Sequence, residues 1–170
     1  MMVGITGTPG TGKSSAGDEL ARRGYSVIRL VDTLRPYILE RDAERDTLVA
    51  DEEEWAKEFP PVEGIVEGHL AHYLSCDQIL ILRCRPDILS GRLRKRGYEE
   101  EKIQENMEAE ALDVILQEVI DRFSPSQIYE VDATTLTTEE VADIVEEVVT
   151  GTRNPSYGSI DWSGYLQEAP

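Results

Sequence analysis

The residues best suited to chemistry lie near the N-terminus, in the run Gly7-Thr8-Pro9-Gly10-Thr11-Gly12-Lys13-Ser14-Ser15. This run matches the G-x-x-x-x-G-K-[ST] pattern of a phosphate-binding loop, the P-loop. Its glycines let successive backbone N–H groups point into one concavity, and the positive end of a following helix faces the same anion. In such a loop Lys13 reaches the β- and γ-phosphates, and the Ser14 hydroxyl ligates Mg²⁺. The pattern therefore predicts that a nucleoside triphosphate is bound by Gly10, Thr11, Gly12, Lys13, Ser14 and Ser15.

The segments on either side of this run are of the kinds that a P-loop needs. Residues 2–6 form a short apolar run suited to a buried strand. Residues 14–23 carry Ala16 and Leu20 at helical spacing, and Gly24 can end that helix. A glycine-rich turn that only links a strand to a helix is the alternative, and the strand–loop–helix context argues against it.

A glutamate and a histidine follow another predicted strand. Glu67 comes directly after the apolar pair Ile65-Val66, at a strand end where P-loop enzymes place the acid that holds Mg²⁺ directly or through water. The alternative is an exposed loop acid. His69 could orient the attacking water or the acceptor, or it could be structural, and the sequence leaves both roles open. We therefore predict Lys13, Glu67 and His69 as catalytic residues, with Ser14 and Glu67 as metal ligands.

A basic cluster stands out in a chain that has 17 basic and 34 acidic residues. Its members are Arg83, Arg85, Arg92, Arg94, Lys95 and Arg96. Phosphoryl transfer requires positive charge on the moving group, so we expect at least Arg92 or Arg96 to close over the triphosphate. The alternative is a solvated helix face balanced by the acidic residues 99–101.

The hydrophobic pattern of the remaining chain alternates between strands and helices. Apolar runs predict strands over 25–30, 64–69, 78–83 and 128–131. Helices are predicted over 86–96, over 99–123 as one long helix and over 137–151, with a short helix over 33–41 inside the polar segment 31–61. This alternation predicts an α/β three-layer P-loop fold with a mostly parallel five-stranded sheet. Because ligands bind beyond the carboxyl ends of parallel strands, the P-loop and Glu67 should meet in one cleft.

Composition limits the range of partners. The chain has 170 residues, enough for one domain with its own core, and a net charge of −17. So acidic a surface repels nucleic acid and argues against direct base-specific binding. A salt-rich cytoplasm and a mildly acidic protein of no special habitat are both compatible with this charge. No apolar run approaches the roughly 20 residues of a membrane span, and Cys76 and Cys84 fit neither a zinc site nor a disulfide framework, so a reduced cytoplasm is expected.

The C-terminal part of the chain differs in composition from the rest. From Arg153 onward it is rich in Asn, Pro, Ser, Gly and Tyr. We predict a single domain over residues 1–153 and a tail over residues 154–170. The aromatic residues Trp162 and Tyr165 could dock on the core or bind a partner, and composition does not decide between the two.

Three segments together resemble a known family. Residues 7–13 have the form G-x-P-G-x-G-K, and they occur with Val66-Glu67-Gly68-His69 and with Arg92-x-x-x-Arg96-Gly97-Tyr98. Over residues 2–150 the chain resembles the adenylate kinase-like ATPases of archaea and eukaryotes, also called broad-specificity nucleoside monophosphate kinases, which are linked to small ribosomal subunit maturation. The family often has Asp before the histidine, in an Asp-x-His sequence, whereas this chain has the longer Glu67.

The resemblance implies a nucleoside monophosphate kinase-like fold and a site for ATP and Mg²⁺. It also implies an acceptor-binding segment near residues 29–52, with Arg35 on the nucleoside monophosphate, and a short lid near residues 95–105, with Arg96 on ATP. A transient partner is implied as well, a ribosomal protein of the small-subunit platform. The acidic residues after Asp51 depart from the family pattern and leave the acceptor contacts open.

Three functions are compatible with these observations. The first is a kinase that transfers the γ-phosphate of ATP to AMP or another nucleoside monophosphate. The second is an ATPase that acts as a ribosome assembly factor, and the third is a small-metabolite kinase of the shikimate or gluconate type. A GTPase is disfavoured because the chain has no N-K-x-D sequence to read guanine.

Overall fold

A sheet of five parallel strands, in the order β2-β5-β1-β6-β7, forms the centre of the computed structural model, which describes residues 1–44 and 47–166. The strands are β1 (Met2–Thr6), β2 (Val27–Arg29), β5 (Gly64–Glu67), β6 (Gln78–Arg83) and β7 (Ile128–Asp132). Ile5 of β1 lies opposite Glu67 on one side and Leu80 on the other. Ile5 and Leu80 are fully buried, as expected for a parallel sheet covered on both faces. The predicted α/β fold with a five-stranded parallel sheet is confirmed.

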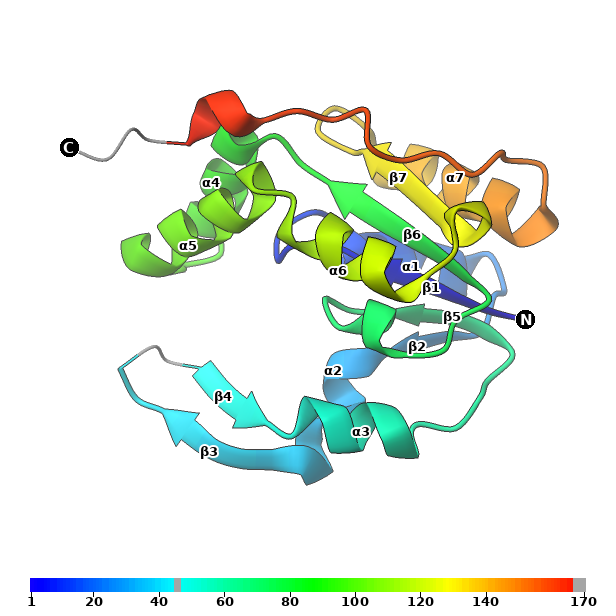
Figure 1. Cartoon of the computed structure of the whole chain (residues 1–170), viewed down its shortest axis with the longest axis horizontal. Helices are drawn as coiled ribbons and strands as arrows, with labels where there is room; N and C mark the ends of the chain where they lie inside the picture. The colour runs from blue at the N-terminus through cyan, green and yellow to red at the C-terminus, as the bar shows by residue number, and fades with distance from the viewer. Residues whose placement is uncertain (45–46, 167–170) are drawn as a thin grey trace.

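Helices cover both faces of this sheet (Figure 1). They are α1 (Lys13–Arg22), α2 (Leu30–Thr33), α3 (Glu52–Glu58), α4 (Pro86–Lys95), α5 (Glu100–Ala111), α6 (Val114–Arg122) and α7 (Thr138–Thr150), with short 3-10 turns η1 (Arg35–Tyr37), η2 (Ala71–Tyr73), η3 (Pro125–Gln127) and η4 (Ser163–Tyr165). Leu20 of α1 and Val145 of α7 share one core with Ile5. Trp55 of α3 and Val119 of α6 belong to a second core, on the other side of the sheet. Within the described residues, no helix is both long and apolar enough to cross a membrane.

The segment between β2 and β5 differs from the prediction of a short helix over 33–41 and a loop. It forms α2, η1, an antiparallel hairpin of β3 (Ile38–Asp42) and β4 (Thr47–Ala50), and α3. Pro36 is accommodated in the first turn of η1, after which the chain becomes extended at Ile38. Trp55 is buried and its indole N–H donates to Thr33 Oγ1 at 2.8 Å, so a distant contact holds α3 in place. Residues 45 and 46 lie outside the described residues.

The long helix predicted over 99–123 is wrong, because it is two helices, α5 and α6. The break lies at Asp113, whose φ of 57° is left-handed and uncommon for a residue other than glycine. In this conformation the Asp113 carboxylate accepts a hydrogen bond of 2.6 Å from the Arg83 guanidinium. Leu112, directly before this break, is 57% exposed.

The C-terminal segment runs along the outer edge of the sheet beside β7 (Figure 1). Ser156 pairs with Tyr129 in a parallel bridge, and its backbone exchanges hydrogen bonds with Glu130 at 2.8 Å and Ile128 at 3.0 Å. Trp162 is buried, whereas Tyr165 is 41% exposed. Of the two aromatic residues whose placement the sequence left open, Trp162 docks on the core.

Candidate functional site

The P-loop joins β1 to α1 and is held close to α4. Gly10 has a φ of 91°, and a Cβ atom there would lie 2.9 Å from the Leu89 and Leu93 side chains. A larger residue would be both strained and obstructed, so glycine is required at this position. Gly7 has a φ of 151°, and a Cβ atom on it would meet the Leu82 carbonyl oxygen at 2.5 Å. Close backbone packing therefore fixes the loop from below.

The Thr8 carbonyl oxygen is the hydrogen-bonding centre of the loop. It accepts from the Thr11 backbone N–H at 3.3 Å, the Thr11 hydroxyl at 2.9 Å and the Lys13 ammonium at 3.0 Å. Lys13 also donates to the Gly7 carbonyl oxygen at 2.7 Å and is only 9% exposed. Burial lowers the pKa of Lys13 from 10.5 to about 8, and the nearby Glu67 carboxylate offsets only part of this shift. The predicted phosphate-binding cation is thus buried against the loop.

Two cavities open on the two sides of the P-loop. The larger has a volume of about 490 Å³ and extends toward the carboxyl ends of β2 and β5; its lining includes Lys13, Ser14, Arg29, Leu34, Glu67, His69, Tyr98 and Lys102. The smaller, of about 180 Å³, extends toward the β7–α7 connection; its lining includes Thr11, Ser15, Arg92, Ala133, Leu136 and Thr138. Gly10, Gly12 and Arg96 line both cavities. A molecule in one cavity would therefore lie next to a molecule in the other.

Glu67 lies at the end of β5 and its carboxylate is almost fully buried beside the larger cavity. Arg29 donates to Glu67 Oε1 at 3.2 Å and also to Asp18 at 2.9 Å. Glu67 and Ser14 line the same cavity, and carboxylate and hydroxyl oxygens are ligands that suit Mg²⁺. The donor chemistry of these two residues thus fits the predicted metal. Among the described residues no group of three or more His, Cys, Asp and Glu side chains could hold a metal ion.

His69 follows Glu67 on the wall of the same cavity, with its side chain open to the cleft. The cleft walls remove water from around the imidazole, and this loss of hydration, together with the nearby Lys13 cation, lowers the pKa of His69 from 6.5 to about 4. Even the ordinary value leaves most of the imidazole neutral at pH 7, and the shift increases the neutral fraction. The second histidine, His72, was not predicted as a site residue. It is buried, with its ring nitrogens 2.8 Å from Thr6 Oγ1 and 2.6 Å from Glu118.

The basic cluster of the sequence separates into residues that reach the cavities and residues that do not. Arg96 ends α4 and lines both cavities. Arg92 donates to the carbonyl oxygens of Gly10 and Thr134, each at 3.3 Å, and thereby connects the P-loop to the β7–α7 connection. Arg83 does not join the arginines that line the cavities, because it is buried and paired with carboxylates behind the P-loop. Arg85 and Arg94 form exposed ion pairs with Asp87 and Glu100.

Arg35 is placed apart from these residues. It is exposed and its guanidinium lies 3.9 Å from the Asp32 carboxylate, while Arg29 occupies the wall of the larger cavity. The role of Arg35 toward an acceptor stays a prediction. Arg29, Tyr98 and Lys102 line the cavity without having been assigned a role from the sequence. Arg29 is the last residue of β2, so the rule that ligands bind at strand ends could have identified it.

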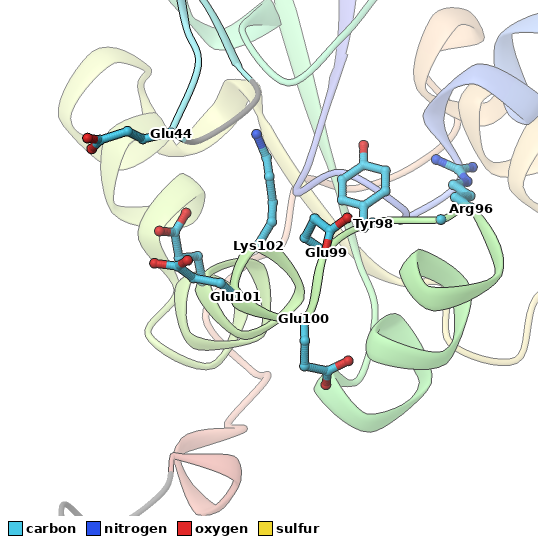
Figure 2. Close-up of a pocket in the computed structure, with 9 residues that line it drawn as sticks. Glu44, Arg96, Tyr98, Glu99, Glu100, Glu101 and Lys102 are labelled. Carbon is cyan, nitrogen blue, oxygen red and sulfur yellow. The ribbon is translucent and has the colours of Figure 1, made fainter.

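A third cavity, of about 680 Å³, opens between the β3–β4 hairpin and the start of α5 (Figure 2). Its lining includes Glu44 from the hairpin together with residues 96–102. Figure 2 shows Lys102 pointing toward the hairpin and Glu100 pointing away from it. Arg96 belongs to this lining too, so the predicted lid segment 95–105 borders all three cavities.

Comparisons with known proteins identify the family of this chain. The sequence matches the AAA domain family over residues 3–113. It is 42% identical to a protein of Archaeoglobus fulgidus named "Putative adenylate kinase", with 99% of this chain and 95% of the other covered. A protein of the same name from Methanothermobacter thermautotrophicus is also 42% identical, with 97% of this chain and 99% of the other covered.

Solved structures agree at the level of the fold. A deoxyadenosine kinase from M. mycoides superposes with a TM-score of 0.58 at 18% identity, covering 90% of this chain and all of the other. A gluconokinase from Sinorhizobium meliloti superposes with a TM-score of 0.52 at 16% identity, covering 89% and 92% of the two chains. The sequence matches carry the assignment further than the fold alone: this chain belongs to the family of archaeal adenylate kinase-like proteins, which are P-loop kinases in fold.

Proposed function

We propose that the protein is a nucleoside monophosphate kinase that transfers the γ-phosphate of ATP to AMP or another nucleoside monophosphate. The observation that carries this proposal is the pair of cavities that meet at Gly10, Gly12 and Arg96. Transfer between two nucleotides needs two adjacent sites with a shared cationic boundary, because the phosphoryl group must pass in line from one to the other. The names of the relatives support the same activity.

In this proposal the smaller cavity receives the base of ATP and the larger cavity receives the acceptor. An oxygen of the acceptor phosphate attacks the γ-phosphorus, the bond to the β–γ bridging oxygen breaks, and two nucleoside diphosphates leave. Lys13 and Arg96 place positive charge beside the phosphoryl group as it moves. Ser14 and Glu67 would hold Mg²⁺, which neutralises charge on the β- and γ-phosphate oxygens when bound. Residues 29–52 would form the acceptor side, with Arg35 on its phosphate, and residues 95–105 the lid.

A nucleotide assay tests this proposal directly. The purified protein is incubated with ATP and Mg²⁺, alone and with AMP, CMP, UMP or GMP, and ADP is quantified. Strong stimulation by at least one monophosphate is expected. Shikimate and gluconate serve as the alternative acceptors, and stimulation by one of these alone would replace the proposal with a small-metabolite kinase. GTP in place of ATP should be a poorer donor.

Hydrolysis of ATP without an acceptor is a second proposed activity, and His69 supports it. A neutral imidazole on the cavity wall can accept a hydrogen bond from water, as positioning of a nucleophile requires. Slow release of ADP from ATP alone, lost in His69→Ala, is the expected result. A rate equal in the two proteins would remove the histidine from this role.

A coupling of this ATPase to small ribosomal subunit maturation in the cytoplasm is also proposed, from the family resemblance. The net charge of −17 favours a basic partner such as a platform ribosomal protein over bare RNA. Co-purification from native extract at low and high salt tests this. A ribosomal protein retained without RNA after nuclease treatment is the expected outcome, and recovery of ribosomal proteins only while RNA is intact would contradict it.

A further inference from the structure

Behind the P-loop lies a buried group of ion pairs, here named the Arg83 cluster and made of Arg83, Glu110, Asp113 and Glu130. The Arg83 guanidinium donates to Glu110 Oε1 at 2.6 Å, Glu130 Oε2 at 2.7 Å and Asp113 Oδ1 at 2.6 Å. It also donates to the Glu110 carbonyl oxygen at 2.8 Å. The side chains of Arg83, Glu110 and Glu130 are each 2% exposed or less. Burial alone would lower the pKa of Arg83, but these carboxylates outweigh it and raise the pKa.

One member of the cluster contacts the P-loop itself. Glu110, in the last turn of α5, accepts a hydrogen bond from the Thr8 hydroxyl through Oε2. Its other oxygen, which binds Arg83, also accepts the backbone N–H of Cys84 at 3.2 Å. One oxygen of the Glu110 carboxylate is therefore hydrogen-bonded to the end of β6, and the other is hydrogen-bonded to the P-loop.

Thr8 connects the Glu110 carboxylate to the residues that are predicted to bind the phosphates. Its carbonyl oxygen accepts hydrogen bonds from Thr11 and from the Lys13 ammonium. Its hydroxyl is buried and is directed to Glu110. A shift of Thr8 would move the carbonyl oxygen that accepts from the Lys13 ammonium, so Thr8 connects the Glu110 carboxylate to the lysine.

The C-terminal segment closes the opposite side of the cluster. The Trp162 ring lies over the Arg83 guanidinium, with 5.1 Å between the guanidinium carbon and the ring centroid. Gly158 donates its backbone N–H to Glu130 Oε1 at 2.9 Å. A cation over an indole face is attracted to it, and the ring also keeps water away from the ion pairs. The segment beyond the kinase-like fold thus completes the shell around Arg83.

Simple stability is a poor explanation for this arrangement. Apolar residues of similar size often stabilise a core as well as buried ion pairs do, because charges lose their hydration on burial. The cluster also requires Asp113 to adopt a left-handed conformation that interrupts the helix between α5 and α6. What the charges provide, and apolar packing would not, is a directional anchor for the Thr8 hydroxyl.

We propose that Glu110 is a positioning residue for the P-loop, which acts through Thr8 on Lys13, and that Trp162 holds the Arg83 cluster in the geometry this requires. The proposal rests on the proposed function, since the property that it explains is the binding and transfer of phosphate. Trp162 thereby gives the C-terminal segment a part in a site whose lining includes none of its described residues, 154–166.

The test compares two substitutions at one position. Thr8→Ser keeps the hydroxyl that Glu110 binds, and Thr8→Val keeps the shape but removes it. Thr8→Val is expected to lower kcat/KM for ATP by roughly tenfold or more, because small displacements of charged groups in a phosphoryl-transfer site cost about that much. KM for AMP should stay unchanged, and Thr8→Ser should stay close to the wild type.

A second pair of variants tests the C-terminal segment. Trp162→Phe keeps an aromatic face over Arg83 and should retain most of the activity. Trp162→Leu removes that face and should lower kcat/KM for ATP several-fold, in the same direction as Thr8→Val. Tyr165→Ala, at a more exposed position on the same segment, is the matched control and should change nothing.

Thermal stability and nucleotide affinity separate this proposal from its alternatives. Val145→Ala removes volume from the core that α7 shares with α1 and provides a variant of lowered Tm in which every residue of the P-loop and of the Arg83 cluster is kept. Equal kcat/KM for Thr8→Val and Thr8→Ser, or a loss in Val145→Ala as large as in Thr8→Val, would overturn the positioning role. ATP affinity, measured with a fluorescent ATP analogue, tests the same role without any acceptor. If the wild type transfers phosphate to no monophosphate, the proposed function fails, and the affinities of the Thr8 pair still decide the role of Glu110.

Discussion

The cavity lined by Lys13, Glu67 and His69 has two sides that are built in different ways. The donor side is the P-loop, backed by Ile5, Leu80 and Leu82, all with 0% exposure. The proposed acceptor side is the segment between β2 and β5, whose hairpin carries Leu39 at 68% exposure. Among the described residues of that segment, Leu30 and Trp55 are buried in the core, and Leu34, Tyr37 and Phe59 pack against it while partly exposed.

This difference in burial predicts which side of the cavity is rigid and which side can move. Local opening costs least free energy where few apolar contacts would be lost. The donor side therefore presents a fixed arrangement of phosphate-binding groups, and the acceptor side can adjust around its ligand. Loss of a donor-side group should damage transfer itself, whereas loss of an acceptor-side group should mainly weaken binding of the monophosphate.

Removal of the donor-side cation should have the largest effect. Lys13→Ala is expected to lower kcat for transfer and for hydrolysis by about 10³-fold or more, the scale of a lost transition-state cation in phosphoryl transfer. The fold should persist, because the hydrogen bonds that the ammonium makes within the described residues go to two P-loop carbonyl oxygens. Steady-state rates and circular dichroism test both parts. Lys57→Ala, on the exposed face of α3, is the matched control, and turnover of Lys13→Ala within tenfold of the wild type would refute the assignment.

The boundary between the two sides can be tested with Glu67 and His69. Glu67→Gln removes the charge predicted to hold Mg²⁺, so transfer and hydrolysis should both fall by at least about 10²-fold. His69→Ala should lower hydrolysis by about 10²-fold and spare transfer to AMP. In transfer the nucleophile is an oxygen of the AMP phosphate, so no water has to be positioned. Rates of ADP formation with and without AMP measure both. If Glu67→Gln retains Mg²⁺-dependent turnover, another residue holds the metal, and Asp32 is the next to test.

The same division explains what could be predicted from the sequence. The donor side follows from short-range signals: the spacing of Gly7, Gly12 and Lys13, and the apolar runs of β1 and β6. These signals act through backbone conformation and burial, which are local to a strand and the turn after it. The sheet was therefore predicted correctly, and the P-loop lies between β1 and α1, in the strand–loop–helix context expected from the sequence.

The acceptor side and the Arg83 cluster depend on contacts between distant residues. The indole of Trp55 reaches Thr33, and Arg83 draws Asp113 out of a helical pattern. Neither contact leaves a periodic trace in the sequence, so the hairpin was missed and two helices were predicted as one. Arg83 was grouped with the cavity arginines because a sequence gives its charge and not the direction of its side chain.

A moderate effect is expected on the acceptor side. Arg35→Ala should raise KM for AMP by about tenfold with little change in kcat, because one charged hydrogen bond to phosphate contributes about 1.5–3 kcal/mol. KM for ATP should not change. Arg29→Lys is the comparison, since it keeps a cation beside Glu67 but loses the planar fork that lines the cavity. A raised KM for AMP in Arg29→Lys alone would transfer the acceptor role from Arg35 to Arg29.

The smallest expected effect is a pH dependence that belongs to the donor side alone. Lys13 must be protonated to bind phosphate, and burial lowers its pKa to about 8 in the free protein. Below pH 8 the cation is present, and as the pH rises through 8 it is lost, so kcat/KM for ATP should fall by about fourfold between pH 7 and 8.5. Phosphate groups, with a second pKa near 6, are already ionised over this range and do not contribute.

Lys13→Arg keeps its charge throughout, so its profile should be flat above pH 7 whatever its absolute rate. KM for AMP, set on the other side of the cavity, should be constant from pH 7 to 8.5. A decline of equal size in Lys13→Arg would show that a different group titrates.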